Sequence, residues 1–130
     1  MKLELTILKN LIYNEDYLRK VLPFLKPEYF TDSESRTLYK EINEFVQTYN
    51  STPTIEAITL AVQEKRNLTD DQVEKCKSDL QEIKESASER SELQWLINKT
   101  EQFCQEKAIY NAVLGSISIL DGKEIGRAHV

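Results

Sequence analysis

An unbroken helical pattern runs from Ser91 to Asp121, and it constrains the fold of this chain more than any other feature. In its first half, apolar residues such as Leu96 and Phe103 recur on one helical face. Beyond Lys107 the apolar residues cover much of the helix circumference, and no proline interrupts the segment. A long helix that is apolar on most sides needs a partner surface.

Helix-breaking residues are scarce in the rest of the chain as well. The 130 residues include three glycines and three prolines, which favours helices over a turn-rich β fold. We therefore predict an all-α fold. It consists of a compact helical head of about five short helices over residues 1–90, followed by a long helix over residues 91–121.

The starts of the helices can be placed from side chains that cap free backbone N–H groups. Capping boxes are predicted at residues 31–34 and 69–72. Further N-caps are predicted at Asn14 and at either Thr52 or Thr54, and the last helix is predicted to start at residues 91–94.

The sequence shows no pattern of residues that is typical of a catalytic, metal or cofactor site. The only histidine is His129, and Cys76 and Cys104 lie on apolar helix faces, where a free cysteine is usually a small core residue. Glycine occurs only at positions 115, 122 and 126, so no glycine-rich phosphate loop is present. We expect this chain to contribute no catalytic residue, metal ligand or cofactor-binding residue.

Charge and hydropathy exclude two further classes of function. The formal net charge is -5, and the 17 basic and 22 acidic residues are mixed along the chain. A nucleic-acid surface needs a dense basic patch, so we expect no strong nucleic-acid binding. No segment is typical of a membrane span or a signal peptide, and we expect no membrane contact and a cytoplasmic location.

Five aromatic residues have two interpretations, since aromatic rings can stack on nucleic-acid bases or fill a core. Their helical spacing favours the core. They are Tyr29, Phe30, Tyr39, Phe45 and Tyr49.

The C-terminal residues 124–130 read Glu-Ile-Gly-Arg-Ala-His-Val, which matches the translation of a common sequencing-library adapter. We expect this segment to be an artefact of the source DNA and the native sequence to stop near Lys123. His129 would then not belong to the natural protein.

Three segments of the chain and one further residue resemble a known family. The segments are residues 29–30, 35–42 and 49–53, and the residue is Ile58. The part of the family that they resemble is the N-terminal domain of DnaB-type replicative DNA helicases. Phage members of the T-even type are more similar still, through Trp95-Leu96 and the run from Thr100 to Ala112. The similarity covers about residues 5–120. Ser35 and Thr54 depart from the cellular pattern, which often has His and Asp there, and favour a phage protein.

The resemblance implies a globular helical head followed by a helical hairpin. In the family, such hairpins pair subunits into dimers within a hexameric ring, and the N-terminal collar contacts primase and the helicase loader during DNA replication. ATP and Mg²⁺ belong to a separate C-terminal RecA-like domain, which this chain does not contain. The expected location is the cytoplasm of a bacterial host cell.

In this interpretation the long helix is the first arm of a truncated hairpin, and its apolar stretch is the subunit or partner interface. The expected interface residues are Ile109, Tyr110, Val113, Leu114, Ile117 and Leu120. Alternatively, this stretch packs against the chain's own head.

Two other functions remain open at this point. A stand-alone helical protein–protein adaptor or regulator would use the same long helix. A DNA-binding module would use the helices around Ile55 and Val73, although the acidic balance counts against it.

Overall fold

The computed structural model describes the backbone of residues 1–128 and the side chains of residues 1–117. The described residues form six α-helices and two short 3-10 helices, without a strand, which confirms the predicted all-α fold of short helices followed by a long one. The elements are α1 (Leu3–Tyr13), α2 (Glu15–Val21), η1 (Leu22–Phe24), η2 (Pro27–Tyr29), α3 (Ser33–Tyr49), α4 (Ile55–Glu64), α5 (Asp70–Glu85) and α6 (Leu93–Ala128).

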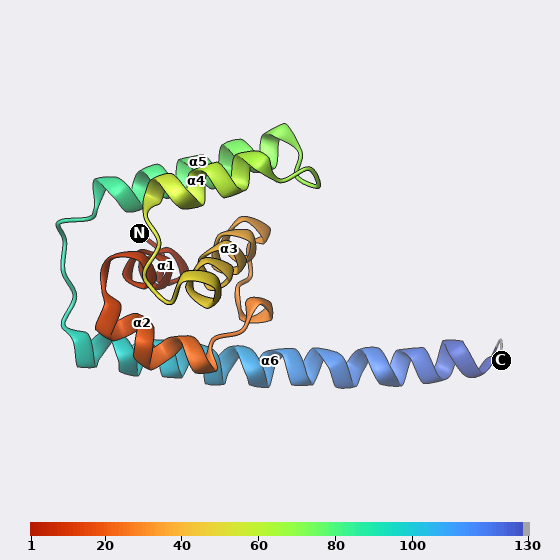
Figure 1. Ribbon diagram of the computed structural model, residues 1–130. Helices are drawn as coiled ribbons and strands as arrows, with labels where there is room; N and C mark the ends of the chain where they lie inside the picture. Colours follow the sequence, from red (N-terminus) through yellow and green to blue (C-terminus); the bar gives the residue numbers. More distant parts are fainter. Residues whose placement is uncertain (129–130) are drawn as a thin grey trace.

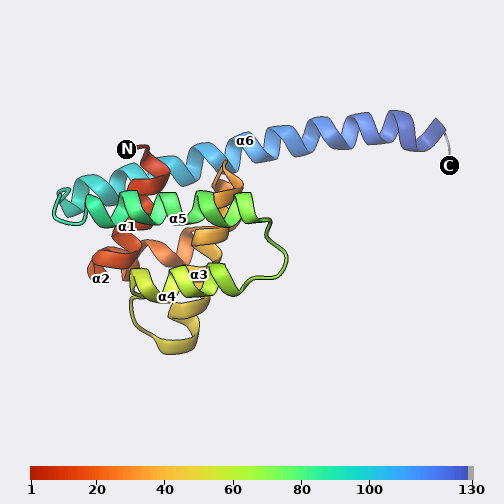
Figure 2. The ribbon, with the colours of Figure 1, turned by 90° about the horizontal axis from the view of Figure 1, so that it is seen from above.

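The helices are arranged in three layers, as Figure 1 shows. The α4–α5 hairpin lies on one side, α1 and α3 lie in the middle, and α2 and the first half of α6 lie on the opposite side. In both views the second half of α6 extends beyond the rest of the chain (Figures 1 and 2). No helix in the described part of the chain is both long and apolar enough to cross a lipid bilayer.

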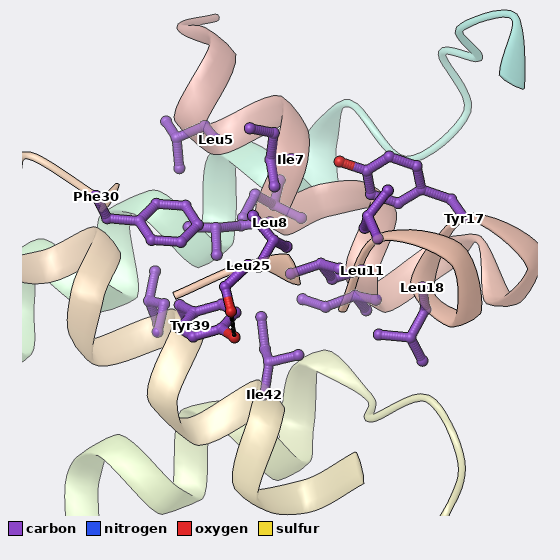
Figure 3. Packing of buried hydrophobic residues seen from close by; sticks show 14 of the residues in the cluster. Leu5, Ile7, Leu8, Leu11, Tyr17, Leu18, Leu25, Phe30, Tyr39 and Ile42 are labelled. Carbon is purple, nitrogen blue, oxygen red and sulfur yellow. Dashed lines mark hydrogen bonds between the residues drawn. The ribbon is translucent and has the colours of Figure 1, made fainter. Parts of the chain in front are cut away.

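The core is built around α1, which contacts α2, α3 and α5. Figure 3 shows its leucines facing Phe30 and Tyr39, whose rings stack at 5.1 Å between centroids. The Tyr39 hydroxyl donates a hydrogen bond of 3.0 Å to the carbonyl oxygen of Leu25, which satisfies a polar group inside an apolar cluster.

Two polar residues of α1 are buried as well. Lys9 donates from Nζ to the carbonyl oxygen of Glu89 at 2.8 Å, and Asn10 donates from Nδ2 to the carbonyl oxygen of Thr6 at 2.9 Å. These bonds offset part of the cost of burying polar groups. The bond of Lys9 also ties the segment between α5 and α6 to the core.

Three of the predicted helix starts are confirmed. The side chain of Asn14 accepts from the backbone N–H of Tyr17, and Thr69 forms the complete capping box with Gln72. Thr54, rather than Thr52, is the N-cap of α4.

The predicted capping box at residues 31–34 is wrong because another contact competes for the same backbone group. The backbone N–H of Thr31 bonds to the carboxylate of Glu4 from α1, and α3 starts after Asp32 without a side-chain cap. The helix α6 starts at Leu93, within the predicted segment 91–94, and the carboxylate of Glu92 accepts from the N–H groups of Gln94 and Trp95.

The prediction that the aromatic residues form a core is confirmed for Phe30 and Tyr39 and wrong for Tyr49. Tyr49 is 65% exposed, although its ring lies 4.7 Å from that of Phe45. It is the last residue of α3, and Asn50 follows with a φ of 53° that ends the helix. The chain therefore turns away before another element can cover the ring.

Candidate subunit interface

The first half of α6 is part of the core of the head. Leu96, Ile97, Thr100, Phe103 and Cys104 are buried, as the stripe on this helix predicts. Burial raises the pKa of the Cys104 thiol, and likewise that of Cys76 in α5, to about 11. Both cysteines are therefore core residues held as neutral thiols, as expected, rather than nucleophiles.

A buried hydrogen bond fixes this half of α6 against α2. The hydroxyl oxygens of Tyr17 and Thr100 lie 2.6 Å apart. Because Thr100 already donates to the carbonyl oxygen of Leu96 at 2.8 Å, Tyr17 is the donor in this pair. Burial raises the pKa of Tyr17, which keeps the hydroxyl protonated and able to donate.

Two polar residues attach the middle of α6 to the turn before α3. Lys107 donates from Nζ to Oγ1 of Thr31 at 2.8 Å, and Asn111 donates from Nδ2 to the carbonyl oxygen of Glu28 at 3.1 Å. Among the described side chains, these hydrogen bonds to the head lie farthest along α6. The latch, meaning Lys107 and Asn111 with their acceptors, sets the direction in which the helix leaves the head.

An apolar face lies beside and beyond this latch. The five predicted interface residues whose side chains are described are each between 44% and 66% exposed: Ile109, Tyr110, Val113, Leu114 and Ile117. They do not pack against the head, so the alternative of ordinary burial within this chain does not hold for them. The side chain of Leu120 lies outside the described residues. We call the five residues the α6 face.

The α6 face has the spacing of a helix-pairing seam. Tyr110, Val113 and Ile117 are separated by three and then four residues, the alternation that keeps one seam against a partner helix. At 3.6 residues per turn, the face covers roughly 140° of the circumference, which is typical of a helix packed on one side. Gly115 points elsewhere, and a Cβ added there would meet no atom within 4 Å.

The α6 face contains no charged residue, and a lysine lies at its N-terminal end. No charged residue occurs from Ala108 to Leu120. At the near end, the Lys107 ammonium lies 5.9 Å from the ring centroids of both Phe103 and Tyr110, a distance at which a cation is attracted to an aromatic ring. The arrangement can bury apolar surface against another helix, and it offers no group for acid–base or nucleophilic chemistry.

Sequence reasoning missed the latch, although a signal for it exists. Lys107 and Asn111 follow Thr100 and Cys104 at intervals of three and four residues, which places them on the face that packs against the head. Polar residues at these positions indicate that the apolar contact between α6 and the head ends there. Their hydrogen-bond acceptors could not be identified from the sequence, because they belong to residues more than 70 positions away.

No protein-family model matches the chain. The DnaB-like replicative helicase of Enterobacteria phage T4 is 30% identical over 119 residues, which are 92% of this chain and 24% of that protein. The resemblance to DnaB-type replicative helicases is thereby confirmed over nearly the whole chain. This chain spans about a quarter of the length of the helicase that it matches.

Proposed function

We propose that this chain is a non-catalytic assembly domain of a DnaB-like phage replicative helicase. Its α6 face pairs subunits of a hexameric ring, and its head docks primase or the helicase loader during DNA replication. The observation that carries the proposal is the exposed, uncharged α6 face on a helix whose base is buried in the head. The similarity to the phage T4 helicase over 92% of the chain supports it.

Helix pairing in this proposal is driven by burial of apolar surface. Covering one of these half-exposed side chains contributes about 1 kcal/mol, so two facing copies of the α6 face gain on the order of 10 kcal/mol before the cost of association. That cost is of the order of 4–15 kcal/mol. The pairing is therefore reversible and depends on protein concentration, and further contacts would be needed to hold a complete ring.

The latch gives the pairing a defined geometry. Because Lys107 and Asn111 bond to the turn before α3, the α6 face is presented in one orientation relative to the head. Subunits that pair through this face would then place their heads in a reproducible arrangement, as a closed ring requires.

The residues of this chain do not fit an ATP site. Its glycines stand only at positions 115, 122 and 126, and none belongs to a glycine-rich loop that ends in Lys-Ser or Lys-Thr. In the proposal, ATP and Mg²⁺ act in a separate RecA-like domain of the longer protein, and this chain supplies no catalytic residue.

The test is the oligomeric state of charge variants, measured by light scattering over a range of protein concentrations. Tyr110→Glu and Val113→Asp place a charge in the seam, and both should reduce self-association while circular dichroism shows unchanged helix content. Ala112→Asp is the matched control, because this exposed residue lies next to Val113 in sequence but outside the α6 face, roughly 130° around the helix from its middle.

Association that persists in Tyr110→Glu and Val113→Asp would refute the pairing role of the α6 face. An equal loss in Ala112→Asp would also refute it, since the effect would then come from added charge rather than from the seam.

A further inference from the structure

A groove runs between α4 and α5, on the hairpin that lies on the opposite side of the head from α6 (Figure 1). It has a volume of about 400 Å³. Leu80, which is buried, and Ile55, which is half-buried, contribute its apolar lining, while Leu60 lines it from α4 and is 57% exposed. An exposed leucine beside an apolar floor is a feature of grooves that receive another side chain.

The groove continues past the start of α4. A second hollow of about 420 Å³ shares Ile55, Glu56 and Lys84 with the first and is lined further by Tyr13 and Pro53. The two hollows together form one trough that follows the hairpin toward the end of α1. We call it the α4–α5 trough.

The charges along the trough differ between its two walls. Lys77 and Lys84 line the α5 wall, seven residues apart, which places them on one face of α5 and about 10 Å apart along its axis. Lys77 lies 3.6 Å from Glu74, and no ion pair of Lys84 is found among the described residues. Glu56 lines the α4 wall.

We propose that the α4–α5 trough docks an amphipathic helix of a partner protein. That helix would place apolar side chains on the floor at Ile55 and Leu80, and carboxylates two turns apart along the edge that faces Lys77 and Lys84. A helix suits the site because the two lysines repeat at its seven-residue spacing. The proposal rests on the docking half of the proposed function and assigns it a surface and a partner chemistry.

A second copy of this chain does not fit the trough through its α6 face. That face has no charged residue from Ala108 to Leu120, so it lacks the carboxylates that the lysines would meet. The α4–α5 trough and the α6 face therefore select different partners, and both can be occupied at once, since they belong to opposite layers of the molecule.

The experiment uses the full chain and a synthetic helical peptide as the probe. The peptide has leucines at positions i, i+4 and i+7 and glutamates seven residues apart on one edge, and the control peptide has lysines in place of the glutamates. Binding is followed by titration with NMR detection of the backbone amides. We expect the acidic peptide to shift the signals of Ile55, Leu60 and Lys84, and to bind roughly tenfold more tightly than the basic one.

Charge reversal in the protein makes the test specific. Lys84→Glu should weaken binding of the acidic peptide roughly tenfold and improve binding of the basic peptide, whereas a purely structural role of Lys84 would weaken both. The matched control is Lys75→Glu, because Lys75 is exposed on α5 but does not line the trough. Lys75→Glu should leave both affinities unchanged.

Equal binding of the two peptides, or shifts that map to the α6 face, would overturn the inference. The result can be separated from that of the proposed function, because Val113→Asp should reduce self-association without changing peptide binding. If the peptide does not bind while Val113→Asp still reduces self-association, the trough inference fails and the pairing role stands.

Discussion

Lys107 of α6 and Thr31, which precedes it by 76 residues, are joined by a hydrogen bond of 2.8 Å from Nζ to Oγ1. The backbone N–H of Thr31 in turn lies 3.2 Å from a carboxylate oxygen of Glu4 in α1. A single threonine thus links the first helix of the chain to the last one. This link lies where α6 leaves the head, so it influences the direction of the α6 face.

The first prediction concerns the strength of this link. In a double-mutant cycle, Lys107→Met and Thr31→Val should show a coupling free energy of about 0.5–1 kcal/mol, because each variant removes one partner of the same partly exposed hydrogen bond. Urea unfolding measures the four proteins of the cycle. Lys99→Met with Thr31→Val serves as the control pair and should be additive. Strict additivity of the Lys107 pair would show that the link contributes nothing to stability.

The second prediction concerns the buried bond between α2 and α6. Tyr17→Phe removes the donor to Thr100 while Thr100 keeps its own bond to Leu96, so the free energy of unfolding should fall by about 1–2 kcal/mol. The loss is measured by thermal or urea unfolding. Tyr29→Phe is the matched control, since no hydrogen bond of the Tyr29 hydroxyl is found among the described residues, and it should be nearly neutral. Equal effects of the two variants would contradict the assignment of Tyr17 as the donor.

The third prediction concerns the free energy of unfolding at alkaline pH. Burial raises the pKa of Cys76 and Cys104 to about 11 and that of Tyr39 to about 12. Above the ordinary values of these groups, the unfolded chain loses protons that the folded chain keeps, so the free energy of unfolding falls as pH rises. We expect this stability to be fully present below about pH 8 and to decrease steadily between about pH 9 and pH 12.

Urea unfolding at several pH values checks this dependence. The double variant Cys76→Ala/Cys104→Ala should show a shallower decline between about pH 9 and pH 11, because two of the linked groups are gone. The same slope in the variant and the original protein would show that the thiols do not contribute.

Most of the fold could be predicted from the sequence because local signals and tertiary packing agree in it. Apolar residues at helical spacing identify the buried faces, and the caps at Asn14 and Thr69 mark helix starts that depend on neighbouring residues alone. The capping box at residues 31–34 was mispredicted because Glu4 offers a carboxylate to the backbone N–H of Thr31. Such competition depends on distances that the sequence does not contain.

The candidate surfaces were predictable to different degrees. The α6 face can be read from the sequence, because its apolar residues exceed what one buried stripe needs. The α4–α5 trough cannot, since it requires Leu60 and Lys84 from two helices to lie side by side, and neither helix has an unusual pattern by itself. The exposure of Tyr49 likewise depends on where the chain turns after α3.

The pairing role of the α6 face is tested by an isotope-filtered NMR experiment on a mixture of isotope-labelled and unlabelled chains, at a concentration where light scattering detects association. We predict intermolecular contacts from the methyl groups of Val113, Leu114 and Ile117 to the second chain. Contacts that arise only from residues of the head such as Leu60, or a chain that stays monomeric at every concentration, would contradict the assignment of the α6 face as the pairing surface.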